Sequence, residues 1–208
     1  MVFNSTIFVL LFLFVFLLYW FLPIRGKHSL IIVASVLFYA WYSVPFFIMF
    51  ITVLGVNYAV AMKLIEQRGQ SRPSLALLWL AIGLDLSILA FFKYFYLFAS
   101  SAGNLFGIPY LIDIRANLLE DYNLKIILPI GISFYIFQLI AFVVDCYRGT
   151  IADRIDFRRF AVFILFFPQF IAGPILRATD FLPQIDNPTL TVDRLRRGML
   201  LLLFGAIK

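Results

Sequence analysis

The chain has 208 residues, of which 63% are hydrophobic, 19% aromatic and 13% charged. Soluble domains are closer to half apolar and a quarter charged, so this composition predicts a polytopic membrane protein. The net charge of +6 does not indicate nucleic-acid binding, because the basic residues lie between apolar runs, as the positive-inside rule describes. A single cysteine, Cys146, and a single histidine, His28, exclude an intramolecular disulfide and a multi-histidine or cysteine metal site.

The first apolar run covers residues 3–22. No basic residue precedes it and no small-residue cleavage site follows it, so we expect a retained helix rather than a signal peptide. Arg25 and Lys27 follow directly. These two charges predict that this end of the helix lies in the cytoplasm and that the N-terminus lies outside.

The second run, residues 29–62, would be about 51 Å long as one helix, whereas the hydrocarbon core of a membrane is about 30 Å thick. Pro45 lies in its middle, and basic residues flank both of its ends. Two cytoplasmic flanks require an even number of crossings. We therefore expect two short helices, joined by an outside turn at residues 43–45.

A fourth span is predicted over residues 74–100, with Asp85 well inside it. A charged carboxyl exposed to lipid is costly, so this side chain should face protein, as a protonated or hydrogen-bonded packing residue. Lys93 lies about 12 Å further along the helix, too far to pair with Asp85, and is expected to reach the outer interface. Residues 101–124 read as a polar connection outside the membrane.

A fifth span is predicted over residues 126–144, with Pro129 and Gly131 in its first turns. Arg148 in the last turn and Gly149 after it are typical of a helix end. Asp145 and Arg148 are three residues apart and can meet on one helical face. A structural ion pair is a better interpretation than a catalytic one.

The run from residue 160 to 176 lies between two basic loops, which a single crossing cannot join. Pro168, Gly173 and Pro174 disfavour a straight helix, so we expect a re-entrant or broken hairpin. A further helix starts at Met199. The whole pattern predicts an all-α fold with about five spanning helices, this hairpin and the start of a further helix. Residues 1–208 would form one transmembrane domain, the first half of a longer chain.

Catalytic motifs are missing from the sequence: it has no glycine-rich phosphate loop, no GxSxG, and no histidine and carboxylate at metal-ligand spacing. His28 reads as a structural residue. What remains is a set of polar or backbone-freeing residues inside apolar runs, namely Ser133, Tyr135, Gln138, Gln169, Gly173 and Pro174. They either form hydrogen bonds between helices or line a tunnel for a polar substrate, and the residues alone leave both interpretations open.

Two long motifs carry a family resemblance. Residues 129–138, Pro-Ile-Gly-Ile-Ser-Phe-Tyr-Ile-Phe-Gln, and residues 145–149, Asp-Cys-Tyr-Arg-Gly, are similar to the membrane-bound O-acyltransferase family. The similarity is closest to its bacterial branch of alginate O-acetyltransferase-like proteins. Residues 166–177 and 180–184 resemble the same branch, as do residues 37–42, 57–58 and 92–94, so the resemblance covers the whole chain. Asp85 is a departure, since an asparagine-like residue is expected there.

The resemblance implies transfer of an acyl group, usually acetyl, to hydroxyls of an exported polysaccharide such as alginate. It implies acetyl-CoA or an acyl carrier as co-substrate, no bound cofactor, and a histidine base in a funnel across the membrane. That histidine is expected beyond residue 208, so no catalytic residue is expected here, and the polar residues above would belong to the tunnel wall. The resemblance further implies the bacterial inner membrane and periplasmic or extracytoplasmic partner proteins that act on the polysaccharide.

Two other classes of function remain as alternatives. A transporter or channel subunit would predict inverted repeats and ion-binding groups on broken helices, whereas the sequence has one broken region and no repeat. A non-catalytic membrane scaffold would fit the missing histidine.

Overall fold

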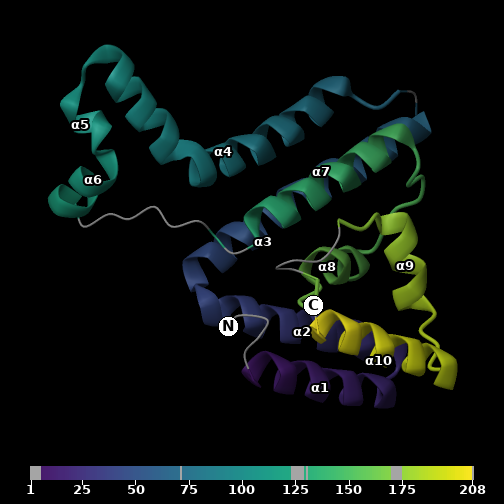
Figure 1. Ribbon diagram of the computed structural model, residues 1–208. Helices are drawn as coiled ribbons and strands as arrows, with labels where there is room; N and C mark the ends of the chain where they lie inside the picture. Colours follow the sequence, from purple (N-terminus) through teal and green to yellow (C-terminus); the bar gives the residue numbers. More distant parts are fainter. Residues whose placement is uncertain (1–5, 71, 123–128, 130, 170–174, 208) are drawn as a thin grey trace.

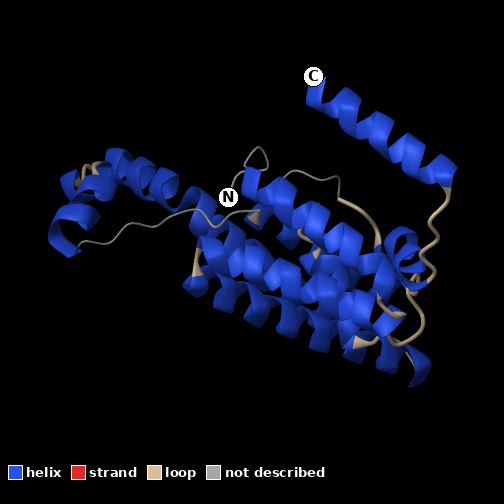
Figure 2. Ribbon diagram, turned by 90° about the horizontal axis from the view of Figure 1, so that it is seen from below, coloured by secondary structure: helices blue, strands red, loops and turns tan. Residues whose placement is uncertain are grey.

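The computed structural model describes residues 6–70, 72–122, 129, 131–169 and 175–207. Within this part of the chain the regular structure is helical and no strand occurs (Figures 1 and 2). The expected all-α class is therefore confirmed. The helices are α1 (Thr6–Phe21), α2 (Ile24–Tyr42), α3 (Val44–Gln70), α4 (Leu75–Phe106), α5 (Pro109–Ile112), α6 (Ile114–Tyr122), α7 (Ile132–Arg148), α8 (Phe157–Leu165), α9 (Ala178–Asp186) and α10 (Val192–Ile207).

The break between α2 and α3 lies at Ser43, whose backbone is extended with φ −166° and ψ 118°. Pro45 then falls in the first turn of α3, where its missing N–H leaves no intrahelical bond unmade. The predicted division of the long apolar run is thus confirmed. Arg25 and Lys27 were expected between two helices. In the structure α2 begins at Ile24, so both residues lie in its first turn.

Helix α4 is longer than expected. It begins after Ser74, whose side chain accepts a hydrogen bond from the Leu77 N–H at 3.3 Å, and it ends at Phe106. Gly107, with φ 63°, ends the helix in the left-handed region that glycine adopts without strain. The expected start of the outside connection at residue 101 is therefore wrong, since residues 101–106 continue the helix.

Helix α5 folds back against the end of α4, at one end of the molecule (Figure 1). Gly103 makes the close approach possible, because a Cβ at this position would lie 2.6 Å from the Ile112 backbone nitrogen. The polar connection predicted from the sequence is in part this short helical arm of α5 and α6.

The main core cluster takes buried side chains from α2, α3, α4, α7, α8 and α9. Helix α7 packs on α3 and α4, α8 packs on α2, and α1 covers α2 (Figure 1). Aromatic rings fill much of the core, as where Phe50 meets Tyr135 with ring centroids 4.3 Å apart. Helices α3 and α4 are both long and apolar enough to cross a membrane. Large apolar side chains cover their outer faces; Trp79 and Phe98 are each 63% exposed. Such a surface is suited to lipid.

Helix α7 ends as its sequence predicts, with Gly149 as the C-terminal cap at φ 82°. Helix α8 ends at Leu165, three residues before Pro168, and residues 167–169 form a turn. A straight helix through this run is thereby excluded, as predicted. Gly173 and Pro174, which complete the predicted hairpin, lie outside the described residues. The further helix is α10, which starts at Val192 rather than at Met199 and stands apart from the other helices (Figure 2).

Candidate functional site

A polar pair lies in the middle of the helix bundle, between α3 and α4. The Asn57 Nδ2 atom donates to Asp85 Oδ1 at 2.8 Å and also to the Val53 carbonyl at 3.0 Å. Both side chains are 0% exposed. Asp85 Oδ2 and Asn57 Oδ1 have no hydrogen-bond partner in the described part of the chain. Asp85 therefore faces protein, as expected, and its partner is an amide donor on the neighbouring helix.

Two tyrosines bring α7 and α2 to the same place. Tyr135 on α7 interacts with Tyr39 on α2 and lies within electrostatic range of Asp85. Tyr135 is 1% exposed and Tyr39 2% exposed. We call Tyr39, Asn57, Asp85 and Tyr135 the polar cluster. The polar cluster therefore joins four helices through buried polar side chains.

Gln138 lies one turn further along α7 and serves a different contact. Its Nε2 atom donates to the Phe163 carbonyl at 3.2 Å, which links α7 to α8. Ser133 is half-buried near the start of α7, and Gln169 is half-buried in the turn after α8. The predicted tunnel residues are thus not all in one place: Tyr135 joins the polar cluster, whereas Gln138 binds the backbone of α8.

The break after α8 has its own polar anchor, which the sequence reading missed. Ser35 on α2, 2% exposed, accepts a hydrogen bond from the Phe167 N–H at 3.3 Å. This N–H has left the helix and needs an acceptor, since a buried donor without one is costly. A serine inside an apolar run, facing another run that contains proline, was the available sequence signal.

The expected ion pair of Asp145 with Arg148 is not among the salt bridges of the described residues. Asp145 is 7% exposed and Arg148 is exposed. The helix end is held instead by Arg68 of α3, whose Nη2 donates to the Tyr147 carbonyl at 3.0 Å. Gly149 packs against the same guanidinium, since a Cβ at Gly149 would lie 2.4 Å from its Cζ.

His28 has structural partners. Its Nε2 lies 3.3 Å from the Ile185 carbonyl and 4.0 Å from the Asp186 carboxylate, and the residue is 6% exposed. Asp186 is also paired with Arg159. No group of three metal-ligating residues occurs among the described residues. Neither His28 nor the polar cluster forms a nucleophile with its base in this part of the chain.

Two membrane-length apolar helices, lipid-suited outer faces and a buried polar cluster indicate a helical membrane protein. The chain is similar to proteins named probable alginate O-acetylase. The one from Pseudomonas putida is 39% identical over 211 residues, which cover 100% of this chain and 42% of the relative. The one from Pseudomonas aeruginosa is 36% identical, with 100% and 39% covered. A peptidoglycan O-acetyltransferase of Helicobacter pylori is 28% identical over 243 residues, with 100% and 44% covered.

These relatives confirm the resemblance to the membrane-bound O-acyltransferase family: the chain is homologous, over its whole length, to proteins named probable alginate O-acetylases. It spans about two fifths of the length of the curated relatives that it matches. No protein-family model matches the chain, and no solved structure matches it significantly.

Proposed function

We propose that this chain is part of a membrane O-acetyltransferase that transfers acetyl groups to hydroxyls of an exported polysaccharide. The observation that carries the proposal is the match of the entire chain to alginate O-acetylases at 34–39% identity. The match to a peptidoglycan O-acetyltransferase supports the same transfer with a different glycan acceptor.

The reaction joins a hydroxyl to an acetyl thioester, carried by acetyl-CoA or an acyl carrier. The hydroxyl oxygen attacks the thioester carbonyl carbon, a new C–O bond forms, and the C–S bond breaks to release the thiol. A histidine base would take the hydroxyl proton and pass it to the departing sulfur, which leaves as the thiol. His28 is unsuited to this role, because it is buried against Ile185 and Asp186. We place the base in the part of the acetylases that this chain does not match.

The described helices would form part of the wall around the reacting groups. Tyr135, together with Ser133, Gln169 and the Gly173–Pro174 segment, would line the passage. Gln138 would hold α7 and α8 in register through its bond to Phe163. Excluding water from such a passage protects the thioester from hydrolysis and strengthens every polar contact inside it.

The acetylation test compares a strain lacking the full-length protein with strains that carry it or its variants. Acetyl esters on the exported polysaccharide, measured by proton NMR, should disappear with the protein and return with it. His28→Gln should keep most of the activity, whereas replacing the base in the unmatched part should abolish it. Unchanged acetylation in the deletion strain, or its loss in His28→Gln at normal protein level, would contradict the proposal.

We further propose about five spans in the bacterial inner membrane, with the N-terminus and the α5–α6 arm outside and periplasmic partners on that side. The buried Cys146 can be replaced by alanine to give a cysteine-free background for the described chain. An impermeant maleimide added to intact spheroplasts should label a cysteine at Arg115 and leave one at Arg154 unlabelled until lysis. The reverse pattern would invert the topology.

A further inference from the structure

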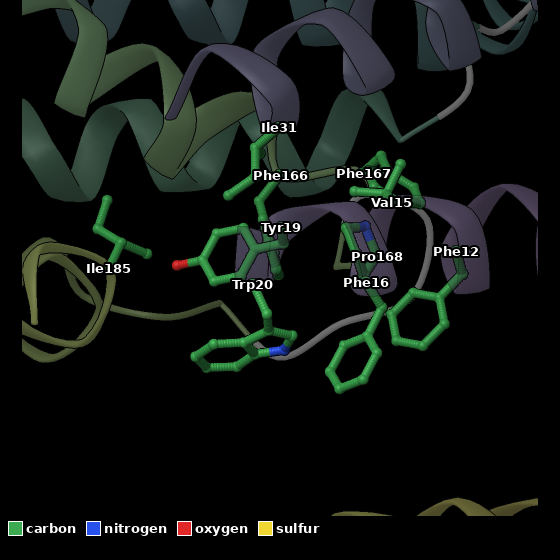
Figure 3. A pocket seen from close by; sticks show the side chains of 10 residues that line it. All are labelled: Phe12, Val15, Phe16, Tyr19, Trp20, Ile31, Phe166, Phe167, Pro168 and Ile185. Carbon is green, nitrogen blue, oxygen red and sulfur yellow. The ribbon is translucent and has the colours of Figure 1, made fainter. Parts of the chain in front are cut away.

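An apolar pocket lies between α1 and the turn that follows α8, with a volume of about 180 Å³ (Figure 3). Phe12, Phe16 and Trp20 line it from α1, and Phe167 and Pro168 line it from the turn. These side chains border one space beside α1. Nearly the whole lining is hydrocarbon, so the pocket suits an apolar chain rather than a polar substrate.

The pocket opens at a helix that is built to face lipid. On the outer side of α1, Leu10, Phe14 and Leu17 are 61%, 64% and 62% exposed. From Phe12 to Trp20 the helix rises about 12 Å, and one leaflet of a hydrocarbon core is about 15 Å thick. The lining residues of α1 therefore extend over a length comparable to one leaflet, and the pocket has room for part of one acyl tail.

A second pocket of about 670 Å³ has a more polar lining than the first, adjoins it, and shares Tyr19 and Trp20 as walls. We call it the polar pocket. Arg194 of α10 borders it. The Lys27 Nζ lies 4.9 Å from the ring centroids of both Tyr19 and Trp20. The nearby carboxylate, Asp186, is already paired with Arg159. The side chains around the second pocket therefore leave an excess of positive charge, which suits an anion.

Trp20 supplies a third, independent observation. Its indole Nε1–H is buried and has no hydrogen-bond acceptor in the described part of the chain. A tryptophan nitrogen can only donate, and a buried donor is usually satisfied. Trp20 lines both pockets, so an oxygen of a molecule that spans them could accept this hydrogen bond.

We propose that the two pockets together bind one anionic phospholipid. One acyl tail lies in the apolar pocket along α1, and the phosphate lies in the polar pocket against Lys27 and Arg194. The Trp20 N–H donates to an ester or phosphate oxygen of the same lipid. The site is lined mainly by α1, the turn after α8 and the segment from α9 to Arg194 of α10. It does not include the polar cluster, so it is independent of the acetyl-transfer proposal.

The test uses the full-length protein in detergent with phosphatidylglycerol that carries a diazirine in one tail. After illumination, crosslinked peptides are mapped by mass spectrometry. Label should concentrate on residues 12–20 and 166–169 and exceed that on residues 91–98 of α4, an apolar segment rich in exposed side chains. Excess phosphatidylglycerol should compete, and phosphatidylcholine with the same tails should not.

Charge variants decide whether the head group is recognised. Lys27→Gln should lower the label on residues 12–20 by about fivefold, the factor that one lysine near an anionic surface provides. Lys27→Arg should restore it. The matched control is Lys93→Gln, because the Lys93 Nζ also lies over an aromatic ring, 5.3 Å from the Tyr94 centroid. Tyr94 lines neither pocket, whereas the two rings next to Lys27 line both.

Three outcomes would overturn the proposal. Equal labelling of α1 and α4, or equal competition by phosphatidylcholine, would mean ordinary lipid contact. Loss of the label in Lys93→Gln as in Lys27→Gln would mean a non-specific charge effect. Competition by acetyl-CoA and not by phosphatidylglycerol would assign the pockets to the acyl donor.

Discussion

Replacing Asn57 by leucine tests whether the polar cluster holds the bundle together. The change removes the donor 2.8 Å from Asp85 Oδ1, and Asp85 Oδ2 already has no partner among the described residues. A buried acceptor left without a donor costs about 1–3 kcal/mol. Leucine has the same branching and the same number of side-chain heavy atoms as asparagine, and its methyl groups are larger, so the change leaves no cavity. We expect the free energy of unfolding to fall by about 2 kcal/mol.

The partner and the double replacement make the test sharper. Asp85→Leu should cost about 1 kcal/mol, because Asn57 keeps its bond to the Val53 carbonyl at 3.0 Å. The double variant should cost about as much as Asp85→Leu alone, since no stranded carboxyl remains. The energies are measured by equilibrium unfolding of the full-length protein in mixed micelles titrated with sodium dodecyl sulfate.

Ser87→Ala is the matched control on the same helix. Ser87 is exposed and bonds only its own helix, at Gly83 O, 2.6 Å away, so its loss should stay within about 0.5 kcal/mol. Two results would refute a stabilising Asn57–Asp85 hydrogen bond between α3 and α4. One is a loss of unfolding free energy in Asn57→Leu as small as in this control. The other is a loss in the double variant equal to the sum of the two single losses.

Three further changes probe the helix ends and the break after α8, each by the same unfolding measurement. Gly149→Ala should cost about 2–4 kcal/mol, because a left-handed backbone is strained for alanine and its Cβ would displace Arg68 from Tyr147; a cost below about 1 kcal/mol would contradict this. Ser35→Ala should cost about 1–2 kcal/mol by stranding the N–H after α8, and Ser35→Thr should recover part of it. Gln138→Leu should lower stability by about 1 kcal/mol through the lost α7–α8 bond and leave acetylation per folded molecule unchanged; a selective loss of acetylation would return Gln138 to the passage wall.

The helix ends that the sequence predicted are those that backbone chemistry dictates. Pro45 marks the start of α3, Gly149 ends α7, and Pro168 follows the end of α8. Proline has a fixed φ and no N–H, and glycine has no Cβ, so both act on the backbone at their own positions. Their effect can therefore be predicted from the sequence alone. The end of α4 was placed at residue 100, whereas the helix continues to Phe106 and ends at Gly107, in the left-handed conformation that glycine adopts without strain.

The candidate site was predicted less well, because it depends on which helices are neighbours. Asp85 was expected to face protein, and it does, but its partner Asn57 was not identified. Tyr135 and Gln138 are three residues apart on α7, yet one faces α2 and the other α8. Their contacts are set by the packing of distant segments, about which residue spacing within α7 carries no information.

The pairing of Asn57 with Asp85 also bears on how the chain enters the membrane. An unpaired aspartate in the middle of a lone helix costs about 3 kcal/mol at insertion. Helices α3 and α4 follow one another directly in the chain, and the asparagine leaves the ribosome before the aspartate. We therefore expect α3 and α4 to be inserted together as a hairpin, in which Asn57 of α3 binds the carboxyl of Asp85 on α4 and shields it from lipid. Tyr135, made fifty residues after Asp85, would then dock onto a pair that is already closed.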